Sequence, residues 1–160
     1  MNILFLHGLE SPLTIDKKII LEKYGNVFAP DLNYKSNPNI IQTLFDEYYN
    51  KNIDVIIGSS MGGFTGFYLS KLFKVPSLLF NPALPYHSTE QNIPNTDVVR
   101  QHLVQFVLGL QDDIINADDN LNFILKFVPR ENDIRIHLLK DLAHRIPITV
   151  FESEVNLFFK

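Results

Sequence analysis

The chain has 160 residues, of which 46% are hydrophobic and 20% charged, proportions typical of a globular protein rather than a disordered one. It carries 14 basic and 18 acidic side chains with no run of Lys or Arg, which argues against a nucleic-acid-binding protein. Cysteine is absent, which excludes disulfides, thiolate metal sites and a cysteine nucleophile. This length predicts a single domain over residues 1–160.

The amino-terminal residues 1–8 are apolar at first but lack a basic segment and become polar after six residues. We interpret them as a buried strand rather than a signal peptide. No apolar run approaches the roughly 18 residues of a membrane span. The expected location is therefore cytoplasmic, and the sequence gives no indication of the oligomeric state.

Short β-branched runs alternate with helical patterns along the chain, and most of the runs are continuously apolar. This pattern predicts an α/β fold: a mostly parallel sheet of about six strands with helices on both faces. The strands are expected at residues 3–6, 27–29, 55–57, 77–80, 104–108 and 134–138. The helices are expected at about 11–24, from 37 through 48, at 64–73, at about 118–127 and at about 149–159.

Three details of these helices can be checked. The first helix should bury one face that carries Ile15, Ile19, Ile20 and Tyr24. The second should begin at Asn37-Pro38, a cap followed by proline at the first helical position, with Ile41, Leu44, Phe45 and Tyr48 on one face. Four phenylalanines at helical spacing are interpreted as core residues rather than ligand contacts: Phe64, Phe67, Phe123 and Phe127.

Residues 81–101 interrupt the alternation with prolines at 82, 85 and 94. The segment is too short and too polar for a second domain or a lid domain. We expect a connection over the sheet edge with at most one short helix near residues 96–100. Three of its residues, Leu84, Pro85 and Tyr86, are candidates for one wall of a substrate cleft.

The segment Gly58-Ser59-Ser60-Met61-Gly62 directly follows an apolar run and precedes a helical pattern. Gly-x-Ser-x-Gly in this context is typical of a nucleophile elbow, a sharp strand-to-helix turn that presents a serine hydroxyl. The two glycines leave room for the neighbouring strand and helix. Ser60 is therefore the candidate nucleophile, against the alternative of a Gly/Ser-rich turn without chemistry.

A serine nucleophile needs a base and an acid that orients the base, which occur in α/β-hydrolases in the order Ser, Asp or Glu, His. Asp112 and Asp113 follow the expected strand 104–108, and His144 lies in the loop before the last helix. His7 is a second candidate base because it also follows a strand. We instead expect its loop to bring the Leu9 N–H to an oxyanion, together with the Met61 N–H.

The sequence resembles the small, lidless α/β-hydrolase esterases of the YqiA-like type over essentially its whole length. The resemblance rests on the segments Phe5-Leu6-His7-Gly8-Leu9, Ala29-Pro30-Asp31-Leu32, the elbow from Gly58 to Gly63, Asn81-Pro82-Ala83, the segment from Gly109 to Asp113, and His144. It implies esterase or thioesterase activity on a small acyl ester or thioester. In the family pattern the acid is the third residue after the glycine, which favours Asp112 over Asp113.

The sequence thus predicts a serine hydrolase with the triad Ser60, His144 and Asp112, an acyl-enzyme intermediate, and no cofactor. No cluster of His, Asp or Glu has the spacing of metal ligands, so no metal is expected. One alternative stays open: an α/β-hydrolase scaffold that has lost catalytic geometry and acts as a binding or regulatory protein. Amide hydrolysis and acyl transfer to an alcohol also share this set of residues.

Overall fold

The computed structural model describes residues 1–9, 11–85, 89–130 and 132–160. Within them the chain forms one six-stranded sheet in the order β2-β1-β3-β4-β5-β6, and every neighbouring pair is parallel. The strands are β1 (Asn2–Leu6), β2 (Asn26–Phe28), β3 (Val55–Ser59), β4 (Ser77–Phe80), β5 (Val104–Gly109) and β6 (Ile134–Leu139). The predicted parallel sheet of six strands is confirmed.

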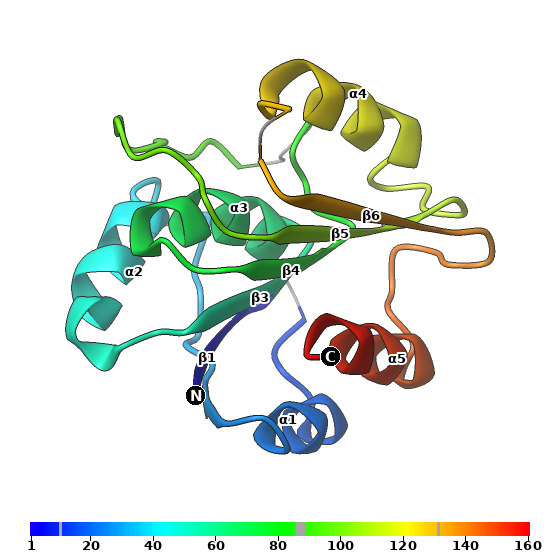
Figure 1. The fold of residues 1–160 in the computed structure, drawn as a ribbon, viewed down its shortest axis with the longest axis horizontal. Coiled ribbons are helices and arrows are strands. Elements are labelled where there is room, and N and C mark those ends of the chain that lie inside the picture. The colour runs from blue at the N-terminus through cyan, green and yellow to red at the C-terminus, as the bar shows by residue number, and fades with distance from the viewer. Residues whose placement is uncertain (10, 86–88, 131) are drawn as a thin grey trace.

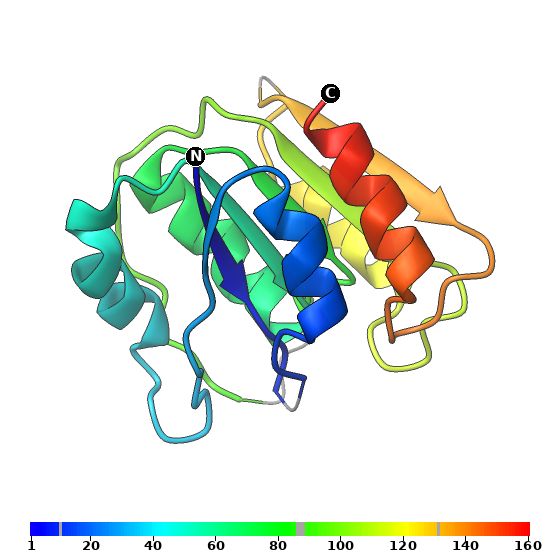
Figure 2. The ribbon, with the colours of Figure 1, turned by 90° about the horizontal axis from the view of Figure 1, so that it is seen from below.

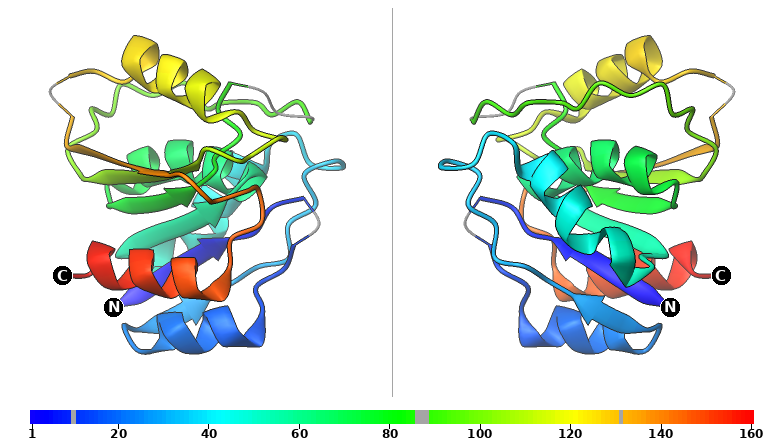
Figure 3. Two further views of the ribbon diagram at one scale, coloured as in Figure 1. Left: turned by 90° about the vertical axis from the view of Figure 1, so that its right-hand side faces the viewer. Right: turned by 90° about the vertical axis from the view of Figure 1, so that its left-hand side faces the viewer.

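Helices cover both faces of this sheet, as predicted. On one face lie α1 (Ile15–Glu22) and α5 (Ile148–Phe158), which are the two helices below the sheet in Figure 1 and in front of it in Figure 2. The other face carries α2 (Ile40–Tyr48), α3 (Met61–Phe73) and α4 (Ala117–Phe127), and Figure 3 shows the three layers from both sides. A short 3-10 helix, Tyr49–Lys51, follows α2.

Two hydrophobic clusters fill the spaces between the sheet and its helices. Alternate residues of one strand enter opposite clusters: Leu4 and Leu6 face the α2, α3 and α4 side, whereas Ile3 and Phe5 face α1 and α5. All four side chains are almost fully buried. Burial on both faces is why the strands are apolar without alternation.

The buried face of α1 differs from the prediction. Ile20 and Leu21 are buried, but Ile15 and Ile19 are 77% and 53% exposed. Positions 19 and 21 lie about 200° apart around a helix of 3.6 residues per turn, so burying Leu21 turns Ile19 toward solvent. The helix also begins only after Thr14, whose hydroxyl caps it by accepting from the Lys17 N–H.

The start of α2 also differs. The helix begins at Ile40, two residues after Pro38, because the Asn37 side chain accepts from the Asn39 N–H and closes a turn before the helix. The predicted buried face is nearly right, since Ile41, Leu44 and Tyr48 are buried.

The phenylalanine prediction holds for Phe64 and Phe67, which are buried, and Phe123 packs partly buried against the same cluster. It is wrong for Phe127, which is 60% exposed. Phe127 is the last residue of α4, where the helix no longer faces the sheet.

The connection from β4 to β5 contains neither helix nor strand in its described residues, 81–85 and 89–103. The short helix expected near residues 96–100 is therefore absent. Burial alternates with a period of two residues from Pro94 to Arg100, the pattern of an extended chain, and the β-branched Val98 and Val99 favour that conformation. None of the described helices is long and apolar enough to cross a membrane.

Candidate active site

Ser60 occupies the turn between β3 and α3 with φ 54° and ψ −120°, a backbone conformation that residues other than glycine rarely adopt. Backbone hydrogen bonds hold it there. Its N–H donates to the Phe80 carbonyl at 3.0 Å, and its carbonyl accepts from Phe64 N–H at 3.0 Å and Ala83 N–H at 3.1 Å. The turn is thus fixed by β4 on one side and by the first turn of α3 on the other.

The glycines on either side of Ser60 are needed for close approach of the backbone. A Cβ on Gly58 would lie 2.3 Å from the Gly62 carbonyl oxygen, and one on Gly62 would lie 2.0 Å from the Leu6 carbonyl oxygen of β1. Both contacts are far shorter than van der Waals distance. The expectation that these glycines make room for the neighbouring strand and helix is confirmed.

His144 and Asp112 meet at the carboxyl edge of the sheet, where the chain leaves β6 and β5. His144 Nδ1 lies 2.8 Å from Asp112 Oδ2, and the Asp112 side chain is fully buried while that of His144 is 21% exposed. The other oxygen of Asp112 accepts the N–H groups of Ile114 and Ile115 at 2.9 and 2.8 Å. Three donors therefore hold the carboxylate in one orientation. Asp113 is exposed.

Asn81 links the loops that carry these two residues, a role that the sequence analysis missed. Its side-chain oxygen accepts from Gly109 N–H at 2.8 Å, at the end of β5. Its side-chain amide donates to the Ala143 carbonyl at 3.0 Å and to the His144 carbonyl at 3.4 Å. The only sequence signal for it is its place directly after β4, between the strands that precede Ser60 and Asp112.

His7 is fully engaged in its own loop. Its Nε2 accepts from Leu32 N–H at 2.9 Å, which requires the ring proton on Nδ1, where the Gly8 carbonyl accepts it. The His7 carbonyl accepts from the Tyr34 hydroxyl at 2.6 Å. Burial raises the pKa of Tyr34 above its ordinary value. This arrangement fits the expectation that His7 shapes the loop, because neither ring nitrogen is free to act as a base.

The two candidate oxyanion donors flank Ser60. Met61 is the first residue of α3, so its N–H has no carbonyl one turn earlier in the helix to bond. Leu9 follows Gly8, and a Cβ on Gly8 would come within 3.3 Å of Ser60 Cβ. The loop after β1 therefore passes directly beside the serine.

Leu84, Pro85 and Tyr86 were expected in one wall of a substrate cleft. Leu84 is 3% exposed and belongs to the core cluster on the α2, α3 and α4 side, and Pro85 is partly buried. Tyr86 lies outside the described residues. In the described part of the chain, no hydrogen bond joins Ser60 to His144, and no group of three His, Asp or Glu side chains could hold a metal ion.

Residues 2–114 match the uncharacterised protein family UPF0227, and the chain belongs to this family. The resemblance to YqiA-like proteins is thereby confirmed. The matched segment includes Ser60 and Asp112 but ends before His144, so the family match does not cover His144, whose contact with Asp112 the structure shows. A sequence comparison with curated proteins finds no match.

Solved structures of α/β-hydrolases share the fold. Mouse alpha/beta hydrolase domain-containing protein 10 superposes with a TM-score of 0.72 at 13% identity, covering 99% of this chain and 89% of that one. Arabidopsis thaliana SOBER1 gives 0.73 at 12% identity, covering 100% and 99%. The Bacillus cereus carboxylesterase gives 0.65 at 14% identity, covering 98% and 86%. At these identities the likeness establishes the α/β-hydrolase fold.

Proposed function

We propose that this chain is a serine hydrolase that cleaves small acyl esters or thioesters through Ser60, His144 and Asp112. The observation that carries the proposal is the 2.8 Å contact between His144 Nδ1 and the buried Asp112 carboxylate, at the sheet edge where the strained elbow presents Ser60. An acid, an imidazole and a serine, in the loops after β5, β6 and β3, are the parts that nucleophilic acyl transfer needs. The carboxylesterase among the structural neighbours supports the reaction class.

In the proposed reaction, His144 Nε2 takes the Ser60 proton as Oγ attacks the acyl carbonyl. Asp112 keeps the proton of His144 on Nδ1 and stabilises the imidazolium that forms. The Leu9 and Met61 N–H groups bind the oxyanion of the tetrahedral intermediate. His144 then protonates the leaving alcohol or thiol, and the same imidazole activates water to hydrolyse the acyl-enzyme.

His144 must come within hydrogen-bond distance of Ser60 Oγ for the first proton transfer. Catalytic contacts are often long without substrate and shorten when the substrate is bound. Asp112 holds Nδ1 of His144, and Asn81 anchors the loop that carries it, so Nε2 is the ring nitrogen that remains to take the serine proton. Of the three residues expected in one wall of the cleft, Leu84, Pro85 and Tyr86, we propose Pro85, which is partly buried.

A fluorophosphonate probe tests the proposal, because it phosphonylates only an activated serine. The folded chain should gain one adduct, read by intact mass, on the peptide that contains Ser60. Ser60→Ala should not react, and it should lower kcat for an aryl ester by roughly 10⁴-fold or more. His144→Ala should slow labelling strongly, whereas His102→Ala, at an exposed histidine before β5, should leave it unchanged.

Failure of the folded protein to react would contradict the proposal and favour the silent scaffold. Labelling at another serine, or ester hydrolysis within about tenfold of wild type in Ser60→Ala, would also overturn it.

A further inference from the structure

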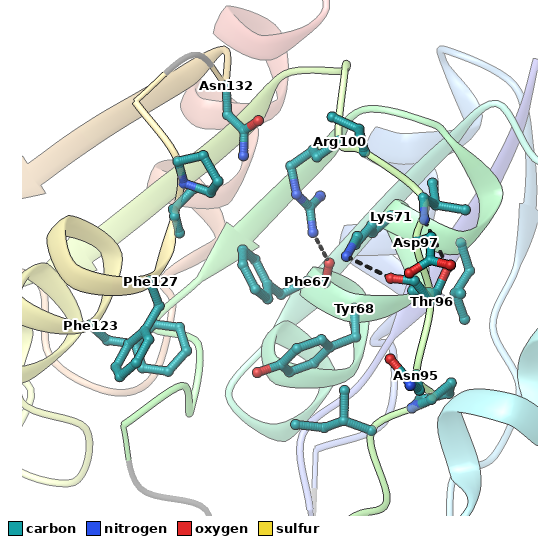
Figure 4. A pocket seen from close by; sticks show the side chains of 17 residues that line it. Phe67, Tyr68, Lys71, Asn95, Thr96, Asp97, Arg100, Phe123, Phe127 and Asn132 are labelled. Atoms are coloured by element: carbon teal, nitrogen blue, oxygen red, sulfur yellow. Dashed lines mark hydrogen bonds between the residues drawn. The ribbon is translucent and has the colours of Figure 1, made fainter.

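A cavity of about 710 Å³ lies between α3, α4 and the extended segment 93–100, and its wall combines aromatic, aliphatic and charged side chains (Figure 4). Its volume is in the range of small-molecule sites. The proposed reaction uses none of the described residues that line it.

The cavity lies near the amino ends of β5 and β6, whereas Ser60 lies at the carboxyl ends of the strands. Arg100 and Asn132 precede β5 and β6, whereas Asp112 and His144 follow the same two strands. Phe67 and Tyr68 are the first residues of α3 that line the cavity. At a rise of 1.5 Å per residue, Tyr68 lies about 12 Å along the helix axis from Ser60. The cavity is therefore separate from the proposed catalytic site.

Arg100 is the notable charged group in this cavity. It is only 8% exposed, and its guanidinium donates to Ser70 Oγ at 2.8 Å and to the Phe67 carbonyl. No carboxylate among the described residues forms an ion pair with it. Burial lowers the pKa of Arg100 to about 10, which still leaves the side chain positively charged at neutral pH. Burying a cation costs free energy, and an anion that pairs with the cation offsets this cost.

The guanidinium has donors to spare. It carries five N–H groups in a planar fork suited to a carboxylate, and the contacts to Ser70 and Phe67 account for only part of them. Two other charged side chains line the cavity. Lys71 Nζ donates to the Thr96 carbonyl at 3.5 Å, and Asp97 lies in the same segment. Among the described lining residues, two cations stand against one anion, which favours a ligand with a single negative charge.

Four of the described lining side chains are aromatic: Phe67, Tyr68, Phe123 and Phe127. The Arg100 guanidinium lies 4.5 Å from the centre of the Phe67 ring, Phe123 meets Phe67 edge to face at 6.3 Å, and Phe127 packs on Phe123 at 4.9 Å. Phe127 is 60% exposed and Val99 is 68% exposed. An apolar or aromatic ligand body would cover these surfaces.

We propose that this cavity binds a small aromatic carboxylate, with its carboxylate paired to Arg100 and its ring between Phe123, Phe127 and Tyr68. The aromatic side chains of the wall and the guanidinium, which no described carboxylate neutralises, together select for a ligand that carries both an aromatic ring and a negative charge. The cavity lies away from Ser60, so ligand binding there does not depend on the proposed hydrolase activity.

Isothermal titration calorimetry with 2-naphthoate tests this, using the full chain in its Ser60→Ala form so that no turnover interferes. We expect saturable binding of one naphthoate per chain, about tenfold tighter than that of neutral 2-naphthamide, because only the anion pairs with Arg100. Acetate, which has the charge without the ring, should bind at least about tenfold more weakly than naphthoate.

Matched variants locate the site. Val99→Glu places a second carboxylate at the cavity and should weaken naphthoate binding about fivefold, whereas Val99→Gln at the same exposed position should not. Phe127→Ala should weaken binding, and Leu125→Ala, exposed on the same helix but not part of the lining, should leave it unchanged. Arg100→Gln should abolish the preference for anion over amide.

The Val99 pair keeps the test decisive if Arg100→Gln does not fold, because both Val99 variants retain Arg100. Equal affinity for naphthoate and naphthamide would overturn the proposal, as would equal binding by Val99→Glu and Val99→Gln. Retained binding in all cavity variants, with loss only when the elbow loop is altered, would place the ligand at the catalytic edge and also overturn it.

Discussion

Asn81 and Ala143 are joined by a hydrogen bond of 3.0 Å from the Asn81 amide to the Ala143 carbonyl, which fixes the loop that carries His144 to the end of β4. The oxygen of the same amide accepts from Gly109 N–H, three residues before Asp112. One side chain therefore joins the loop that carries the base of the proposed triad to the end of the strand that precedes its acid. Its backbone, at φ 39°, is held in place by a bond from its N–H to the Val107 carbonyl.

Asn81→Ala should lower kcat by about 10- to 100-fold with little change in KM, because misplacing His144 by a fraction of an ångström weakens proton transfer more than substrate binding. Fluorophosphonate labelling of Ser60 should slow by a similar factor. Asn50→Ala, at an exposed position after α2, is the control and should have wild-type kinetics. A change in KM alone would show that Asn81 does not position the triad.

Asp112→Asn and Asp113→Asn separate the two adjacent acids. The first variant should lose on the order of 10²–10⁴ in kcat, because an amide cannot stabilise the imidazolium and can favour the wrong tautomer of His144. The second should change kcat little, since Asp113 is exposed and His144 contacts Asp112. Steady-state kinetics on one aryl ester suffice, and the reverse ranking would move the acid by one residue.

Strain at the elbow gives a prediction for stability. Ser60 at φ 54° and ψ −120° stores about 1–3 kcal/mol, which glycine relieves and alanine does not. Ser60→Gly should therefore have a free energy of unfolding about 1 kcal/mol above that of Ser60→Ala, opposite to the usual order of these residues. Urea unfolding of the two variants measures the difference. If Ser60→Ala proved the more stable, the strained turn would not exist in solution.

The residues of the proposed triad could be found from the sequence because each lies in the loop or turn that follows a strand, and the carboxyl ends of parallel strands meet at one edge. Asn81 satisfies the same rule but was given no role, since an asparagine after a strand has no chemistry of its own and its partners are backbone groups of distant loops. The contrast shows that sequence order locates reactive groups better than the groups that hold them.

The errors in the fold have a different origin. For α1, Ile15 and Ile19 were as apolar as the residues that became buried, and only the packing of Leu21 on the sheet decides which face turns inward. At residues 96–100, the β-branched Val98 and Val99 were a local signal for an extended chain, and the Arg100 side chain adds a contact to Ser70 of α3 across 30 residues. A local pattern reveals neither that contact nor the packing of Leu21.

Alkaline pH should destabilise the fold through its buried phenols. Burial raises the pKa of Tyr34, and also those of Tyr48 and Tyr68. A raised pKa in the folded state means that the unfolded chain loses these protons first, so their stabilising contribution is complete below about pH 10 and falls as the pH rises above it. Tyrosinate absorbance should therefore show a late phase that accompanies unfolding, readily seen because the chain has no Trp. Tyr34→Phe should reduce that phase, and its persistence at full amplitude would contradict the buried hydroxyl.

The connection after β4 predicts a preference for short acyl groups. Lid domains of α/β-hydrolases enter at this position, and here the described residues 81–85 and 89–103 form neither helix nor strand. Leu84 is buried in the core and the segment 93–100 lies over the far end of α3, so little of the connection remains to enclose a long chain near Ser60. Each buried methylene contributes roughly 0.8 kcal/mol, so the gain from chain length should stop once a shallow cleft is filled. We expect kcat/KM on p-nitrophenyl esters to peak at about two to six acyl carbons, measured below the micellar concentration of each ester. A steady rise to about twelve carbons or beyond would require a buried acyl channel and contradict the prediction.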